Sequence, residues 1–128
     1  MRVPWHKESP VSGADRMQDE IILRRWIGKV ATERAAEYAK YMAETGAEEI
    51  ETADGNLGHQ ITLRDLGDGT SEITALSWWR DMEAVRDFAG DDPGRARYFT
   101  VDEIYLIEKP DTVEHHVVFS HEFTFRIK

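Results

Sequence analysis

The chain has 128 residues, 41% hydrophobic and 32% charged, which suits one folded domain and excludes a disordered chain. Its 25 acidic and 16 basic residues give a net charge of −9, so the chain repels phosphate backbones and anionic lipids, and neither nucleic acid nor a membrane is an expected partner. The absence of cysteine excludes disulfides, thiol nucleophiles and cysteine-bound metals and favours a reducing, cytoplasmic location.

The opening segment, residues 1–17, predicts a flexible extension. Proline, serine and glycine recur in it, and it has no apolar run long enough for a signal peptide or a membrane helix. We therefore expect one domain over residues 18–128.

The first patterned segment is a strand over residues 20–27 with apolar side chains on both faces. Such a strand is usually covered on both sides, which is a first indication of a dimer. The period then becomes helical over residues 31–45, and Gly46 is the expected end of the helix.

A hairpin is expected next. Strands over residues 57–66 and 71–79 flank a Gly-Asp-Gly turn, in which glycine permits the backbone angles of a tight connection. Asp81 then has the position of an N-cap for a short helix that ends at Ala89, before Gly90.

The last third of the chain predicts a short helix and a long strand. Thr100 and Glu103 have the spacing of a capping box ahead of a short extra helix that ends before Pro110. Residues 113–123 alternate more regularly than any other segment, which predicts a strand long enough to extend beyond its own sheet.

The resulting order is β-α-β-β-α-β, an α+β fold of the ferredoxin-like type with an antiparallel sheet. The two helices cover one face of such a sheet and leave the other bare. A second copy of the chain is the simplest cover, giving a homodimer whose facing sheets form a dimeric α-β barrel.

Several segments resemble the antibiotic biosynthesis monooxygenase-like family of dimeric α-β barrels. The run from Leu76 to Gly90, L-S-W-W-R-D-M-E-A-V-R-D-F-A-G, is similar to the strand-to-helix junction of that family. R-W-I-G at residues 25–28 and V-E-H-H-V-V at residues 113–118 are similar to motifs at corresponding places in bacterial members. The resemblance spans about residues 19–124.

This resemblance implies a homodimer with a pocket between helices and sheet in each subunit. The family includes cofactor-independent oxygenases of aromatic polyketides and haem-degrading enzymes. The latter use an asparagine, a tryptophan and a histidine at places that here hold Trp26, Phe88 and a residue near Tyr98. Because all three differ, we do not expect haem degradation, and we expect no cofactor.

His59 and His115 are the candidate catalytic residues. Each lies on the more apolar face of its predicted strand, where a neutral imidazole can act as a base near pH 7. A base that deprotonates a phenol or hydroquinone makes the ring electron-rich enough to react with oxygen directly. The alternative, a hydrogen-bonded histidine with a purely structural role, is the more common case for a lone histidine on such a face.

Aromatic residues and an arginine are the candidate substrate-binding groups. Trp26 and Tyr98, together with Trp78 or Trp79, could stack on a planar molecule, although core packing is favoured for Trp79. The resemblance adds Phe88, and Arg25 could hold a carboxylate or phenolate, although ion-paired arginines are more common. The expected substrate-binding residues are therefore Trp26, Arg25, Tyr98 and Phe88.

No metal site is expected. His115 and His116 point to opposite faces of a strand, and His115 and His121 lie roughly 20 Å apart at strand rise. A site built from His59 and His115 stays open but lacks a third ligand. The sequence also has no glycine-rich phosphate loop and no dinucleotide fingerprint.

Two functions follow. The leading one is a cofactor-independent monooxygenase or related oxidoreductase that acts on a small aromatic or quinol-type compound. The alternative is a non-catalytic dimer that binds a small ligand or has a stress-related role.

Overall fold

The computed structural model describes residues 20–124, apart from the side chains of residues 47 and 48. The extension predicted for residues 1–17 lies outside the described residues. In chain order the elements are β1 (Ile22–Ala31), α2 (Thr32–Glu51), β2 (Asn56–Asp65), β3 (Thr70–Trp79), α3 (Met82–Ala89), α4 (Thr100–Tyr105), β4 (Leu106–Glu108) and β5 (Glu114–Val117).

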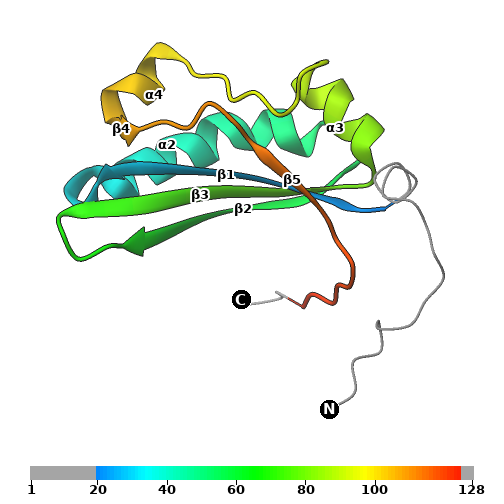
Figure 1. Ribbon diagram of the computed structural model, residues 1–128, viewed down its shortest axis with the longest axis horizontal. Helices are drawn as coiled ribbons and strands as arrows, with labels where there is room; N and C mark the ends of the chain where they lie inside the picture. Colours follow the sequence, from blue (N-terminus) through cyan, green and yellow to red (C-terminus); the bar gives the residue numbers. More distant parts are fainter. Residues whose placement is uncertain (1–19, 125–128) are drawn as a thin grey trace.

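The strands form one antiparallel sheet. β1 lies between β3 on one side and the short strands β4 and β5 on the other, and β2 pairs with the outer edge of β3. This order confirms the predicted ferredoxin-like α+β fold, with α4 and β4 inserted between α3 and β5. Figure 1 shows the helices on one side of the sheet, while the segment after β5 turns beneath the other side.

The side chains beneath the helices form two separate apolar clusters. One holds α3 against one end of the sheet and includes Trp79, which is 0% exposed, as the preference for core packing predicted. The other holds α2 and includes Tyr38. The buried members are Ile22, Trp79, Met82, Ala84 and Val85 in the first cluster, and Val30, Ala35, Tyr38 and Ile73 in the second.

The limits of α3 are those that the sequence predicts. The Asp81 carboxylate accepts a hydrogen bond from the N–H of Ala84 at 2.8 Å, which satisfies one of the unpaired donors of the first turn. Gly90 ends the helix with a φ of 95°, in the left-handed region that glycine adopts without steric cost.

The predicted end of α2 at Gly46 is wrong, because the helix continues to Glu51. A glycine inside a helix lowers helix stability by about 1 kcal/mol relative to alanine. Packing of the helix residues before and after it can offset this cost. The chain turns instead at Gly55, which has a φ of +87°. Neither α2 nor any other helix in the described part of the chain is long and apolar enough to cross a membrane.

The last strand is shorter than predicted. Its pairing with β1 ends at Val117, and the N–H of Val118 still donates to the carbonyl of Ile21 at 2.8 Å. Since β1 begins at Ile22, the residues after 118 have no strand opposite them within residues 20–124. An alternating pattern forms a strand only where another edge accepts its hydrogen bonds.

The short helix α4 begins at the predicted place with a different cap. The carboxylate of Asp102 accepts a hydrogen bond from the N–H of Phe99 at 2.7 Å, so the predicted pairing of Thr100 with Glu103 is wrong. β4 has only three residues, too few for an alternating pattern to reveal it.

Candidate functional site

A row of polar side chains crosses the helix-covered face of the sheet, between the two apolar clusters. The register pairs His59 with Ser77, Ser77 with Arg24, and Arg24 with His115. Because residues paired directly across an antiparallel sheet point to the same face, all four side chains lie beneath the helices. We call these four residues the polar row.

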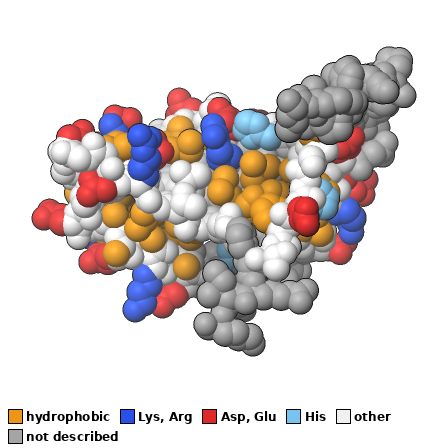
Figure 2. All heavy atoms as spheres, turned by 90° about the horizontal axis from the view of Figure 1, so that it is seen from below, with side chains coloured by type: hydrophobic (Ala, Val, Ile, Leu, Met, Phe, Trp, Pro, Cys, Tyr) orange, Lys and Arg blue, Asp and Glu red, His pale blue; other side chains and the backbone are white. Residues whose placement is uncertain are grey.

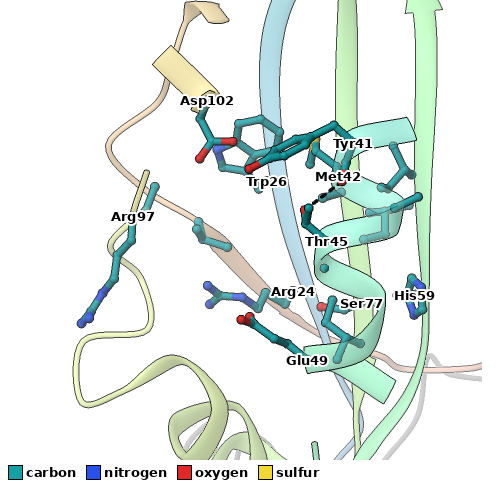
Figure 3. Close-up of a pocket in the computed structure, with 18 of the residues that line it drawn as sticks. Arg24, Trp26, Tyr41, Met42, Thr45, Glu49, His59, Ser77, Arg97 and Asp102 are labelled. Atoms are coloured by element: carbon teal, nitrogen blue, oxygen red, sulfur yellow. Dashed lines mark hydrogen bonds between the residues drawn. The ribbon is translucent and has the colours of Figure 1, made fainter. Parts of the chain in front are cut away.

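A cavity of about 340 Å³ lies above this face, between the sheet, α2 and the chain around residues 96–102. Its size is within the range of pockets that hold small molecules, roughly 300–1,000 Å³. Its aromatic lining consists of Trp26, Tyr38, Tyr41, Phe88, Tyr98 and Phe99. Its charged lining consists of Arg24, Glu49, Arg97 and Asp102 (Figure 3).

Four of the predicted site residues line this cavity: Trp26, His59, Phe88 and Tyr98. The indole N–H of Trp26 donates to the Tyr98 hydroxyl at 2.9 Å, and that hydroxyl donates to the carbonyl of Pro110 at 2.5 Å. The two rings lie 6.2 Å apart at 59°. These bonds tie the loop that carries Tyr98 to β1 and fix one aromatic wall.

The position of the Trp26 indole depends on the glycine two residues further along the strand. A Cβ at Gly28 would lie 2.6 Å from the ring of Trp26 and 2.9 Å from a methyl group of Leu106. The indole therefore occupies the space that a side chain at residue 28 would need.

Arg24 is the half-buried cation of the cavity. One of its terminal nitrogens, Nη1, donates to the carbonyl of Pro93 at 2.7 Å and lies 2.9 Å from Nε2 of His115. Burial lowers the pKa of Arg24, but an arginine stays protonated at any ordinary pH. No carboxylate within residues 20–124 forms an ion pair with it.

His115 lies behind Arg24 and is not one of the residues that line the cavity, so the structure does not support the predicted role of His115 as the base that meets a substrate. Burial, followed by the charges of Arg24 and His116, lowers the pKa of His115 to about 4. The neutral ring therefore accepts the arginine hydrogen bond through Nε2 and has its proton on Nδ1.

His59 does line the cavity, from the strand at the outer edge of the sheet. No hydrogen bond joins its ring to any other residue of the described chain, in contrast to His115. Of the two predicted histidines, His59 is the one with access to a bound molecule.

Arg25 and Trp78 are not in the cavity. Successive residues of a strand point to opposite faces, so Arg25 lies on the open face, where it forms an ion pair with Glu114 at 2.6 Å. Trp78 lies on that face too, 5.4 Å from the ring of Phe123. The predicted placement of Arg25 at the substrate pocket is therefore wrong, and the arginine at the pocket is its neighbour Arg24.

Tyr38 and Asp102 are cavity residues that the sequence did not single out. The Tyr38 hydroxyl donates to the carboxylate of Asp102 at 2.8 Å, and burial together with that bond strongly raises the pKa of Tyr38. The Tyr38 ring stacks on Tyr105 at 4.8 Å. In the sequence Tyr38 is indistinguishable from other apolar positions on its helix face, and Asp102 is one of many acidic residues.

Within residues 20–124 the structure brings no set of metal ligands together. No group of three histidine, aspartate or glutamate side chains within the described residues has the geometry to hold an ion. His59 and His115 are three strand spacings apart, about 14 Å across the sheet, too far to share one ion within a chain. Of the positions aligned with the haem-degrading motif, Trp26 and Phe88 are aromatic, and no histidine lies near Tyr98 in the sequence.

No protein-family model and no curated protein sequence matches this chain. Several solved structures are similar to it. A candidate antibiotic biosynthesis monooxygenase from Bacillus cereus is similar with a TM-score of 0.59 and 15% identity, over 82% of this chain and 99% of that one. A protein from Pseudomonas aeruginosa is similar with a TM-score of 0.54 and 15% identity, over 81% of this chain and 98% of that one.

A third similar structure is a monooxygenase from the gene ActVA-Orf6 of Streptomyces coelicolor, in complex with nanaomycin D. Its TM-score is 0.50 at 18% identity, over 86% of this chain and 95% of that one. Identities this low show the fold alone. They confirm that the chain has the fold of the antibiotic biosynthesis monooxygenase-like proteins that its sequence resembles.

Proposed function

We propose that this chain, whose fold is that of the antibiotic biosynthesis monooxygenases, oxidises a small aromatic or quinol-type compound in the cavity between sheet and helices. The observation that carries the proposal is the aromatic lining of that cavity, with His59 among the residues that line it. Aromatic walls hold a planar molecule by stacking, and an imidazole beside it is a candidate general base. The S. coelicolor monooxygenase of similar fold is in complex with nanaomycin D, which supports a small organic molecule as the ligand of this cavity.

In the proposed reaction His59 removes the hydroxyl proton of a phenol. The phenolate is electron-rich enough to react with O₂ directly, so the step needs neither a flavin nor a metal ion. With a substrate that supplies four electrons, one oxygen atom stays in the product and the other leaves as water. Trp26 and Tyr98 hold the ring in place, and Phe88 closes the far wall.

We also propose that the chain functions as a homodimer through the open face of the sheet. Figure 2 shows hydrophobic side chains gathered in the middle of this face. Trp78 lies there, and Phe119 and Phe123 after β5 are 58% and 56% exposed. A second copy would cover these groups. Sedimentation at low micromolar concentration should give twice the chain mass of 14.8 kDa; a clean monomer would contradict the proposal.

Oxygen uptake with a panel of hydroquinones and anthrone-type phenols tests the enzymatic function. We expect uptake with at least one compound and its loss in His59→Ala, while His116→Ala, on the opposite face of the sheet, retains it. Loss of activity in both variants would point to general damage and not to a base at residue 59.

The second candidate function is a non-catalytic dimer that binds a small ligand in the same cavity. The aromatic walls of the cavity support it, because binding a planar ligand by stacking requires no catalytic base. Binding of panel compounds with no oxygen uptake by any of them would select this function over the oxygenase.

A further inference from the structure

We propose that the cavity takes an aromatic acid, whose carboxylate binds Arg24 while its ring lies against Trp26. This inference rests on the proposed function only in using the same cavity, and it does not require that the ligand be oxidised. It adds Arg24 as a binding residue and replaces a neutral quinol by an anionic ligand.

The first argument is the unbalanced charge of Arg24. Its Nη1 donates to a backbone carbonyl and to a neutral imidazole, and neither acceptor is an anion. A half-buried guanidinium is stable when an opposite charge accepts its hydrogen bonds and costly when none does. Within the described residues no carboxylate does so, which leaves that role to a ligand.

The second argument is the set of donors that remains. Both hydrogen bonds of Arg24 use Nη1, so Nη2 and Nε have no partner in the described part of the chain. Neither atom is a fully buried atom without a partner, and Arg24 is one of the residues that line the cavity. These two nitrogens form one edge of the planar guanidinium, which matches the two oxygens of a carboxylate.

Pro93 and His115 act as positioning groups for that edge. The carbonyl of Pro93 and the ring of His115 hold Nη1 from two directions, which restricts rotation of the guanidinium. A side chain held in this way loses little conformational freedom when a ligand binds. His115 thereby acts on the ligand through Arg24 without contact.

The third argument is the distance between the charge and the aromatic wall. Arg24 and Trp26 are separated by one residue of β1 and lie on the same face, about 7 Å apart at strand rise. A planar acid with fused rings spans that distance, with its carboxylate at one end. Serine and alanine at residues 77 and 75 of β3 leave room beside this line.

Other charges of the cavity bear on an anionic ligand. Figure 3 shows Glu49 on α2 directed toward the same space as Arg24. Glu49 is exposed, so water screens its charge, whereas Arg24 is half-buried. The carboxylate of Asp102 is engaged by Tyr38 and by the N–H of Phe99. Arg97 is exposed like Glu49, and Figure 3 shows its side chain directed away from Arg24.

Calorimetric titration of the full chain with 2-naphthoate and with 2-naphthamide tests this proposal, because the two molecules share a shape and differ in charge. We expect the acid to bind roughly 10- to 100-fold more tightly than the amide, the range of a hydrogen bond to a charged group. Arg24→Gln should remove this preference, with a larger loss of affinity for the acid than for the amide.

Arg25→Gln is the matched control, since it removes the same charge from the opposite face of the same strand. It should keep the preference for the acid. Arg24→Lys retains the charge without the planar edge, so it should keep a smaller preference; it also serves if Arg24→Gln does not fold, which circular dichroism reports.

Equal affinity of wild type for acid and amide, binding of neither, or a preference that survives Arg24→Gln would overturn the proposal. Oxygen uptake separates this outcome from failure of the proposed function. Turnover of neutral phenols without preference for the acid would reject only the anionic ligand. Selective binding of the acid without any turnover would reject only the oxygenase.

Discussion

Replacement of Gly28 by alanine should displace the Trp26 indole and destabilise the protein. The added Cβ would lie 2.6 Å and 2.8 Å from two ring carbons of Trp26 and 2.9 Å from Leu106, against an optimum of about 3.5–4.0 Å between carbon atoms. Relief of these contacts requires the ring or the strand to move. Overpacking of this kind costs about 1–3 kcal/mol of unfolding free energy.

Thermal unfolding measures this cost, with a shift of roughly 3–6 °C per kcal/mol for a chain of this size. We expect a lower melting temperature for Gly28→Ala, a changed tryptophan fluorescence spectrum and weaker binding of any cavity ligand. The control is Gly46→Ala: Gly46 lies inside α2 with open space around its Cβ position, so alanine should stabilise the helix by about 0.5–1 kcal/mol.

The two glycine substitutions thus have opposite expected signs. An unchanged or raised melting temperature for Gly28→Ala would show that the indole of Trp26 does not occupy this space. A decrease of equal size in both variants would show that the effect comes from loss of glycine flexibility and not from the contact with Trp26.

Three further predictions concern hydrogen bonds. Tyr98→Phe leaves the Trp26 N–H without its acceptor and should cost about 1–3 kcal/mol in urea unfolding; a double-mutant cycle with Trp26→Phe should show coupling, and strict additivity would contradict the bond. Because the pKa of His115 is about 4 folded and 6.5 unfolded, only the unfolded chain binds a proton between these values. The unfolding free energy should therefore fall as pH drops from about 6.5 to 4, by about 1–3 kcal/mol more in wild type than in His115→Gln. The glutamine still accepts a hydrogen bond from Arg24 but does not titrate. Parallel pH profiles of the two proteins would refute this. Asp81→Ala should cost about 0.5–2 kcal/mol through loss of the helix cap, and Asp81→Asn much less, as melting temperatures would show.

Local signals in the sequence predicted α3 and the hairpin well. Asp81 and Gly90 act through bonds within a few residues, so their neighbours determine the outcome. Gly46 shows the limit of this reasoning, because a glycine costs a helix only about 1 kcal/mol relative to alanine and α2 continues through it to Glu51. The predicted strand over residues 113–123 is too long for a related reason. Alternation is a property of one segment, whereas a strand also needs the edge of another strand opposite it.

The candidate site could be predicted in part. Trp26, Phe88 and Tyr98 were selected as aromatic residues near a pocket, and all three line the cavity. Strand alternation alone places Arg24, and not Arg25, on the face of Trp26. The contact between Arg24 and His115 spans most of the chain and has no local signature.

The polar row separates the two apolar clusters that hold α2 and α3. A ligand bound above the polar row therefore affects the unfolding of both helices. The cavity is lined by Phe88, which packs against the first cluster, and by Tyr38 of the second. A ligand bound there raises the unfolding free energy by about 2.7 kcal/mol at a concentration one hundred times its dissociation constant. Melting-point screening of a compound library can therefore identify the physiological ligand without assuming a reaction. Amide hydrogen exchange should then slow in α2 and α3 together, because with the ligand bound the two helices open as one cooperative unit.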